Sequence, residues 1–150
     1  MNLKNFLVTA FILATALIFV NFNINIFAQT NEEKAVIEVL KLNAAAIEKG
    51  DFETLDNIWS HREDVIVFEG GNADYTWVNY RDKHLAPELR DFKDLKYAVS
   101  DIKVKVDKKT AWATYKYTLA ADYKTRKIET GGVGTMIFEK KGKNWLIVHS

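Results

Sequence analysis

The residues best suited to acid–base chemistry are His84 and Glu88, which stand four positions apart in a segment with helical periodicity. This spacing places an imidazole and a carboxylate on one face of a helix, where the carboxylate could orient the imidazole as a general base. Structural ion pairs have the same spacing, and they outnumber catalytic pairs. Both interpretations of this pair therefore stay open.

His149 lies on the same face of a strand-like segment as the apolar residues before it. It either lines a cavity or packs as a hydrogen-bonded core histidine. His84, Glu88 and His149 could together ligate a metal, but no spacing requires this, and we expect neither a metal nor a cofactor. The sequence has no nucleophile, phosphate-loop or dinucleotide motif. His61 lies in a polar loop and is expected to be exposed.

Residues 1–28 have the pattern of an export signal. Lys4 is their only charged residue, a long apolar run follows, and asparagines alternate with apolar residues before Ala28. The apolar run is shorter than the ~20 residues that a spanning helix needs. We expect cleavage near Ala28 and an exported protein, periplasmic or secreted, without stable membrane insertion. An uncleaved anchor is the alternative. Cleavage sites prefer small residues at positions −3 and −1, and cleavage after Ala28 would leave Ile26 at −3.

The composition indicates one ordinary globular domain, residues 29–150. The chain of 150 residues has 21 Lys+Arg, 20 Asp+Glu and no cysteine. The lack of cysteine excludes a disulfide scaffold and a thiolate metal site. The near-zero net charge argues against nucleic acid as a partner, because nucleic-acid binders carry a basic excess.

The first part of this domain has the periodicity of three helices. Thr30 and Glu33 form a capping box before a helix over residues 31–49, and Gly50 ends that helix. A short second helix follows from residue 52 and completes a helical hairpin. A third helix is predicted over residues 76–89, with His84 near the middle of its inward face and Pro87 bending or ending it.

The rest of the domain reads as strands. A short strand over residues 65–68 precedes a turn over residues 70–74, and the later strands are predicted over residues 97–106, 111–121, 127–139 and 144–149. Short polar connections make these later strands an antiparallel meander, with a bulge at the glycines of residues 131–134. Helices followed by a sheet predict an α+β fold with the helices on one face of a curved antiparallel sheet.

This order of elements, together with three short motifs, resembles the nuclear transport factor 2-like superfamily, in particular its SnoaL-like and ketosteroid isomerase-like branch. The motifs are Lys49-Gly-Asp51, Ala111-Trp-Ala113 and Trp145-Leu-Ile-Val-His149. The resemblance covers almost all of residues 29–150. It implies a cone-shaped fold, an apolar cavity that holds a small molecule, and a homodimer formed through the sheet.

The resemblance also suggests which positions to test for isomerase chemistry. Glu69 falls at the position of the carboxylate base, although it could equally be a turn residue beside Gly70. The two oxyanion donors of the ketosteroid isomerases fall at Asn43 and Gly134. An asparagine offers one neutral donor and a glycine offers no side chain, so the steroid isomerase mechanism is not expected here.

Further residues are candidates for the cavity wall, with ordinary core packing as the alternative for each. Asn43 interrupts the apolar stripe of the first helix, where a buried amide must find a partner. The aromatic candidates lie on the helices or on one face of a strand. They are Trp59, Trp77, Tyr80, Tyr115 and Tyr117.

These observations leave three functions open. The first, which the altered oxyanion positions favour, is a domain that binds a small apolar molecule. The second is a cofactor-free enzyme of the isomerase, dehydratase or cyclase type, with Glu69 or His84 as general base. The third is a non-catalytic dimerisation module with a filled cavity. An imidazole or carboxylate facing open volume would favour the enzyme.

Overall fold

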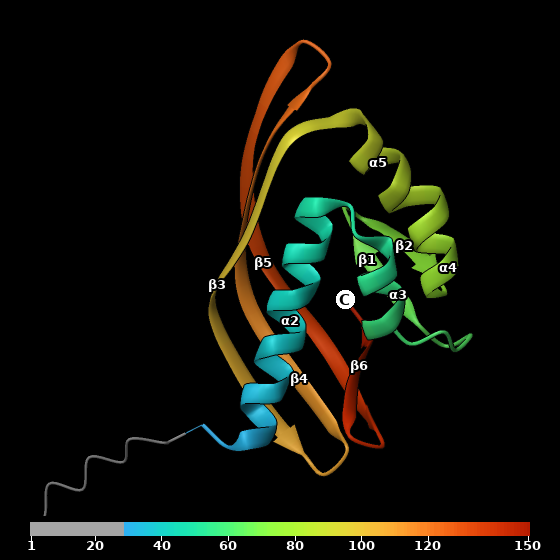
Figure 1. The fold of residues 1–150 in the computed structure, drawn as a ribbon, viewed down its shortest axis with the longest axis vertical. Helices are drawn as coiled ribbons and strands as arrows, with labels where there is room; N and C mark the ends of the chain where they lie inside the picture. The colour runs from blue at the N-terminus through green and yellow to red at the C-terminus, as the bar shows by residue number, and fades with distance from the viewer. Residues whose placement is uncertain (1–28) are drawn as a thin grey trace, which may run out of the picture.

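The computed structural model describes residues 29–150, so the predicted export signal lies outside the described residues. The described part forms an α+β fold in which the helices gather on the concave side of a curved sheet (Figure 1). Within it, no helix combines the length and the apolar character needed to cross a membrane.

The helical hairpin forms where the capping residues predict it. Helix α2 spans Asn31–Lys49; Thr30 Oγ1 accepts from the Glu33 amide at 3.1 Å, and Glu33 Oε2 accepts from the Thr30 amide at 2.8 Å. Gly50 ends α2 with a φ of 64°. Helix α3 spans Phe52–Ile58, capped by the side chain of Asp51. Both predicted helices are therefore confirmed.

The sheet has six strands in the order β2-β1-β6-β5-β4-β3, and it is mixed. The bounds are β1 Ile66–Glu69, β2 Asn72–Tyr75, β3 Phe92–Asp107, β4 Thr110–Tyr123, β5 Arg126–Lys141 and β6 Asn144–His149. Strands β3 to β6 form the predicted antiparallel meander. Strand β1 pairs with β6 in parallel, so the prediction of a wholly antiparallel sheet is wrong at this pair.

The segment predicted as a turn after β1 contains a strand. Gly70 and Gly71 have φ values of 56° and 86°, and this two-residue turn leads directly into β2. Glu69 pairs with Asn72 at the turn, and Val67 pairs with Asp74. The polar composition of β2 hides the strand, because asparagine and aspartate are depleted in strands.

Strand β3 carries the irregularities that curve the sheet. Its register with β4 shifts between Lys93 and Lys96 and again between Ser100 and Lys103. Asp94 and Asp101, which lie in these intervals, have φ values of 51° and 50°. Such bulges bend a strand and increase its twist. The long strands accordingly curve around α2 (Figure 1).

The third predicted helix is present but not regular. It consists of α4 (Trp77–Tyr80), the π-helical turn η2 (Arg81–Leu85) and α5 (Ala86–Asp91). Pro87 was expected either to bend or to end this helix, and it does not end it. The amide of Ala86 bonds to the carbonyl of Arg81, so the turn widens immediately before the proline. His84 lies within this widened turn, where π-helical geometry is often found at functional sites.

Candidate functional site

A cavity of about 560 Å³ lies between the helices and the concave face of the sheet. This volume is within the range of pockets that hold small ligands. Its wall includes eight of the residues singled out in the sequence, together with Glu69. The eight are Asn43, Trp59, Trp77, Tyr80, Glu88, Tyr115, Tyr117 and His149. A cavity of this volume argues against the filled cone that the third function assumed.

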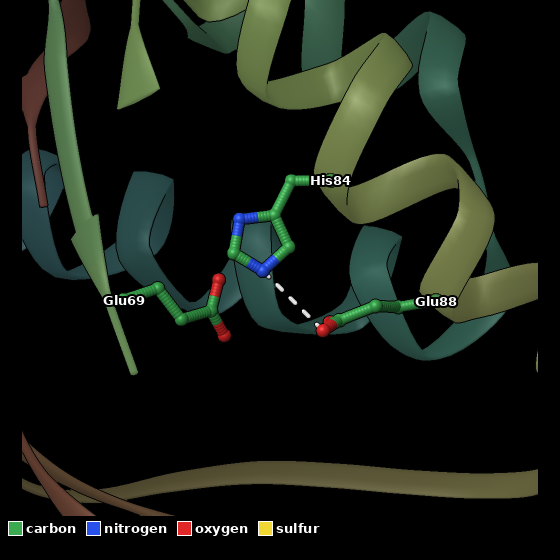
Figure 2. A group of neighbouring side chains, drawn as sticks. All are labelled: Glu69, His84 and Glu88. Carbon is green, nitrogen blue, oxygen red and sulfur yellow. Dashed lines mark ion pairs between the residues drawn. The ribbon is translucent and has the colours of Figure 1, made fainter. Parts of the chain in front are cut away.

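His84 stands beside this wall in a chain of polar contacts that begins on β2. Its Nδ1 donates to Asp74 Oδ2 at 2.8 Å, and its Nε2 lies 3.3 Å from Glu88 Oε1. Figure 2 shows the His84 ring pointing toward the carboxylates of Glu69 and Glu88. The imidazole is therefore oriented by Asp74, and Glu88 occupies the opposite nitrogen.

Glu69 is held by the hydroxyl of Tyr80. Tyr80 Oη donates to Glu69 Oε2 at 2.6 Å, a short hydrogen bond to a carboxylate. Burial raises the pKa of Tyr80 well above its usual value, and the negative charge of Glu69 adds to this effect. Tyr80 therefore remains a donor near neutral pH. Glu69 itself is exposed at the end of β1, where it can reach the cavity.

The polar groups of the cluster alter one another's protonation. The hydrogen bond that His84 donates to Asp74 raises the pKa of His84, and the charges of Glu69 and Glu88 raise it further. Burial raises the pKa of Glu88, with the charge of Glu69 as the second cause. His84 is thus more often protonated than an ordinary histidine. It suits the role of acid, while a carboxylate suits the role of base.

Raising the pH through the neutral range is expected to destabilise the protein through His84. A histidine with a raised pKa in the folded state stabilises the fold fully below its unfolded pKa of about 6.5, and this contribution is lost as the pH rises through the folded pKa. Asp74→Asn removes the main cause of the raised pKa, so its pH dependence should be smaller. Urea unfolding of both proteins across this range measures the difference. Equal slopes of unfolding free energy against pH would contradict the assignment.

Asn43 contributes a donor of fixed orientation. Its side chain is buried, and Oδ1 accepts from Trp59 Nε1 at 2.9 Å. This bond decides which end of the amide is the oxygen. Among the described residues Nδ2 has no hydrogen-bond partner, and Asn43 lines the cavity. The amide group can therefore donate to a ligand oxygen.

The aromatic side of the cavity is built on two stacked indoles. The rings of Trp59 and Trp77 lie 4.7 Å apart with an interplanar angle of 11°. Trp77 Nε1 donates to Asp56 Oδ1 at 2.7 Å, and Arg81 pairs with the same carboxylate at 2.7 Å. These contacts tie α3 to α4 and fix the floor of the site.

The opposite wall consists of tyrosines that lie across glycines of β5. Tyr115 pairs with Gly134 and Tyr117 pairs with Gly132 in an unbroken register, so the bulge predicted at these glycines is wrong. A Cβ atom at Gly134 would lie 2.5 Å from Cζ of Tyr115, and one at Gly132 would lie 2.9 Å from Cε1 of Tyr117. The glycines therefore leave the space that the two rings occupy.

Gly134→Ala is expected to displace the ring of Tyr115 and lower the free energy of unfolding by about 1–3 kcal/mol, the usual cost of overpacking. Thermal or urea unfolding measures this change. Thr135→Ala is the matched control, because its side chain projects from the opposite face of the same strand. If the two variants were equally stable, the close contact with Tyr115 would not constrain this position.

The remaining histidines and the possible metal ligands are placed as follows. His149 lines the cavity, with its ring 5.2 Å from that of Phe68. His61 is exposed as expected. The residues that could hold a metal are Glu69, His84 and Glu88, whose ligand atoms lie within 4.8 Å of one another. From the sequence, we considered His149 as a ligand together with His84 and Glu88. In the structure, Glu69 takes the place of His149 in this group.

Asp74 and Asp56 are the site residues that sequence reasoning missed. Asp74 lies in the segment interpreted as a turn, and Asp56 lies on the polar side of a short helix. Each contacts a residue of the third helical segment, at His84 and Arg81. In the sequence, Asp74 is one of several polar residues before His84, and its position ten residues away does not specify a contact.

Solved structures share this fold. They include a proposed ketosteroid isomerase from Shewanella frigidimarina, with a TM-score of 0.67 and 21% identity over 77% of this chain and 91% of that chain. A proposed dehydratase of the NTF2-like family from Streptomyces avermitilis gives 0.70 and 19% over 79% and 91%. The association domain of CaMKII from C. elegans gives 0.62 and 19% over 80% and 96%.

These likenesses define the class of the protein as the nuclear transport factor 2-like fold, and at such identities they show the fold alone. Residues 36–150 match the SnoaL-like domain, so the chain belongs to the SnoaL-like domain family. The resemblance found in the sequence is confirmed. No curated protein matches the chain.

Proposed function

We propose that the protein binds a small, largely apolar molecule in its cavity and transfers a proton within that molecule, without a cofactor. The observation that carries this proposal is the orientation of His84. Asp74 fixes one ring nitrogen, and the other lies beside Glu88 at the wall of an aromatic cavity that Glu69 also lines. A wall built only for binding apolar molecules would need none of these groups.

The geometry supports a reaction in which a carbonyl directs the proton transfer. The two-donor arrangement of the ketosteroid isomerases is not proposed here, since a ligand carbonyl oxygen would accept a single hydrogen bond, from Asn43 Nδ2. Glu69 would accept a proton from the adjacent carbon, so that the C–H bond breaks and an enolate forms. The His84–Glu88 pair would supply a proton at the second carbon, and Glu69 would then return the proton it took to His84, so that both groups are restored. This scheme corresponds to an isomerase. Where the proton from His84 goes to a leaving hydroxyl group, which departs as water, the scheme corresponds to a dehydratase.

Binding without turnover is the second candidate, and the extent of the aromatic wall favours it. The rings of Trp59, Tyr115 and Tyr117 offer a ligand apolar surface whether or not chemistry follows. Both candidates predict a bound ligand, and only the first predicts exchange of a proton between ligand and solvent.

A homodimer formed through the outer face of the sheet is part of the proposal. Trp112 pairs with Ile137 on that face, and Trp112 and Val133 expose 44% and 81% of their surface. Apolar side chains that are open to solvent favour an interface. Sedimentation of the protein at the mass of a monomer would contradict the dimer.

Export with cleavage near Ala28 also remains a proposal, supported by the pattern of the first residues. The mass of the protein recovered from expressing cells tests it. A chain that retains its N-terminus and stays in the cytosol would contradict it.

The proposed function is tested by a thermal-shift screen against steroids, aromatic polyketides and fatty acids. Saturation of about 100-fold over Kd should stabilise the protein by about 2.7 kcal/mol. Each stabilising compound is then incubated with the protein in D₂O. Deuterium at a carbon next to a carbonyl supports proton transfer. Tight binding without deuterium incorporation would assign the cavity to binding alone.

A further inference from the structure

We propose that the ligand of this cavity carries a positively charged amine on an apolar body. The inference rests on the proposed function only in using the same cavity.

The cluster around His84 carries more negative than positive charge. The carboxylates of Asp74, Glu69 and Glu88 surround one imidazole, that of His84. Even a protonated His84 leaves an excess of negative charge. Among the described residues that line the cavity there is no lysine and no arginine. A cationic group on the ligand would supply the missing positive charge.

The cavity wall beside this cluster is rich in aromatic rings. Aromatic faces attract cations through their quadrupole, and the attraction grows when the cation leaves water. The rings of Tyr97 and Tyr117 lie 5.9 Å apart, and Tyr80, whose hydroxyl donates to Glu69, continues the aromatic wall of the cavity. Carboxylates beside aromatic faces are the surroundings that suit an organic ammonium group.

The contacts of the cluster and the room beside it favour an organic cation over a metal ion. Glu69, His84 and Glu88 offer ligand atoms within 4.8 Å of one another, but the carboxylate of Glu69 is already bonded to the hydroxyl of Tyr80. The cavity of about 560 Å³ has room for an ammonium group together with a hydrocarbon body. A fatty acid would instead bring a like charge toward Glu69.

Three probes with one hydrocarbon body test the inference, namely phenylbutylamine, phenylbutanol and phenylbutyrate. Isothermal titration of the protein at neutral pH measures the three affinities. We expect the amine to bind about tenfold more tightly than the alcohol, which corresponds to one favourable charge interaction, and the acid to bind most weakly.

Variants separate recognition of charge from general damage to the cavity. Glu88→Gln should lower the ratio of amine to alcohol affinity, because it removes one of the three carboxylates of the cluster and leaves the apolar wall. Glu69→Gln is the second variant and should act in the same direction if Glu88→Gln fails to fold. Glu129→Gln is the matched control. It lies on β5 outside the cavity wall, so the ratio should stay unchanged.

Two results would overturn the inference. Equal or tighter binding of the alcohol would show that charge is not recognised, while leaving the cavity and its proton transfer intact. Stabilisation by zinc or manganese ions, abolished by Glu88→Gln and without any preference for the amine, would assign the cluster to a metal. The proposed function fails separately, if no bound carbonyl compound exchanges a proton with solvent.

Discussion

Glu69→Gln is expected to lower the rate of deuterium exchange on a bound ketone by about 10³-fold, within the range that general base catalysis contributes. Glutamine keeps the shape of the side chain and can still pair with Tyr80, but it cannot accept a proton from carbon. The affinity for an uncharged ligand should stay within a few-fold. Exchange followed by NMR in D₂O measures the rate at saturating ligand.

The control for this experiment is Glu129→Gln, which removes a carboxylate away from the cavity. Its exchange rate should equal that of the unaltered protein. An unaltered rate in Glu69→Gln would exclude Glu69 as the base. If His84→Ala then lost the exchange, the base would be assigned to His84, the other residue proposed for this role.

Trp77→Ala is expected to lower the free energy of unfolding by about 3–5 kcal/mol, the usual cost of truncating a buried tryptophan. Trp77 is fully buried and stacks on Trp59. Its loss leaves a void and removes the indole donor of Asp56, whose remaining partner is Arg81. Urea unfolding measures the change, and the same variant should lose its ligand-induced thermal shift.

Trp112→Ala is the matched control, because this indole lies on the outer face and exposes 44% of its surface. Surface substitutions usually change stability by less than about 0.5 kcal/mol. Trp112 belongs to the proposed dimer face. The comparison is therefore made at a concentration at which both variants have the same oligomeric state. Equal losses in the two variants would contradict the role given to the stacked indoles.

The first two helices could be predicted closely because their signals are local. The capping box of Thr30 and the glycine at position 50 fix α2 through bonds within one turn. Strand β2 could not be found in this way. Its residues have low strand propensity, and the strand exists because Gly70 and Gly71 fold it back onto β1. Its pairing is a tertiary effect.

The sequence was sufficient to predict most residues that belong to the candidate site, but not which residues they contact. The pattern put an imidazole and a carboxylate on one helical face, and His84 and Glu88 do lie 3.3 Å apart. The group that orients His84 is instead Asp74, which reaches it from β2. Likewise, the glycines of β5 gave no local sign that they accommodate Tyr115. Contacts between distant segments are set by the fold.

The most direct test of the account is the response of the histidine rings to a bound ligand. The protein has three histidines, so the ¹⁵N signals of the imidazoles can be assigned by substitution. A stabilising ligand is expected to shift the signals of His149, which lines the cavity, and of His84, which contacts the cavity residue Glu88, and to leave exposed His61 unchanged. A ligand that stabilises the protein without moving the His84 signal would contradict the proposal that the His84–Glu88 pair acts on the bound molecule.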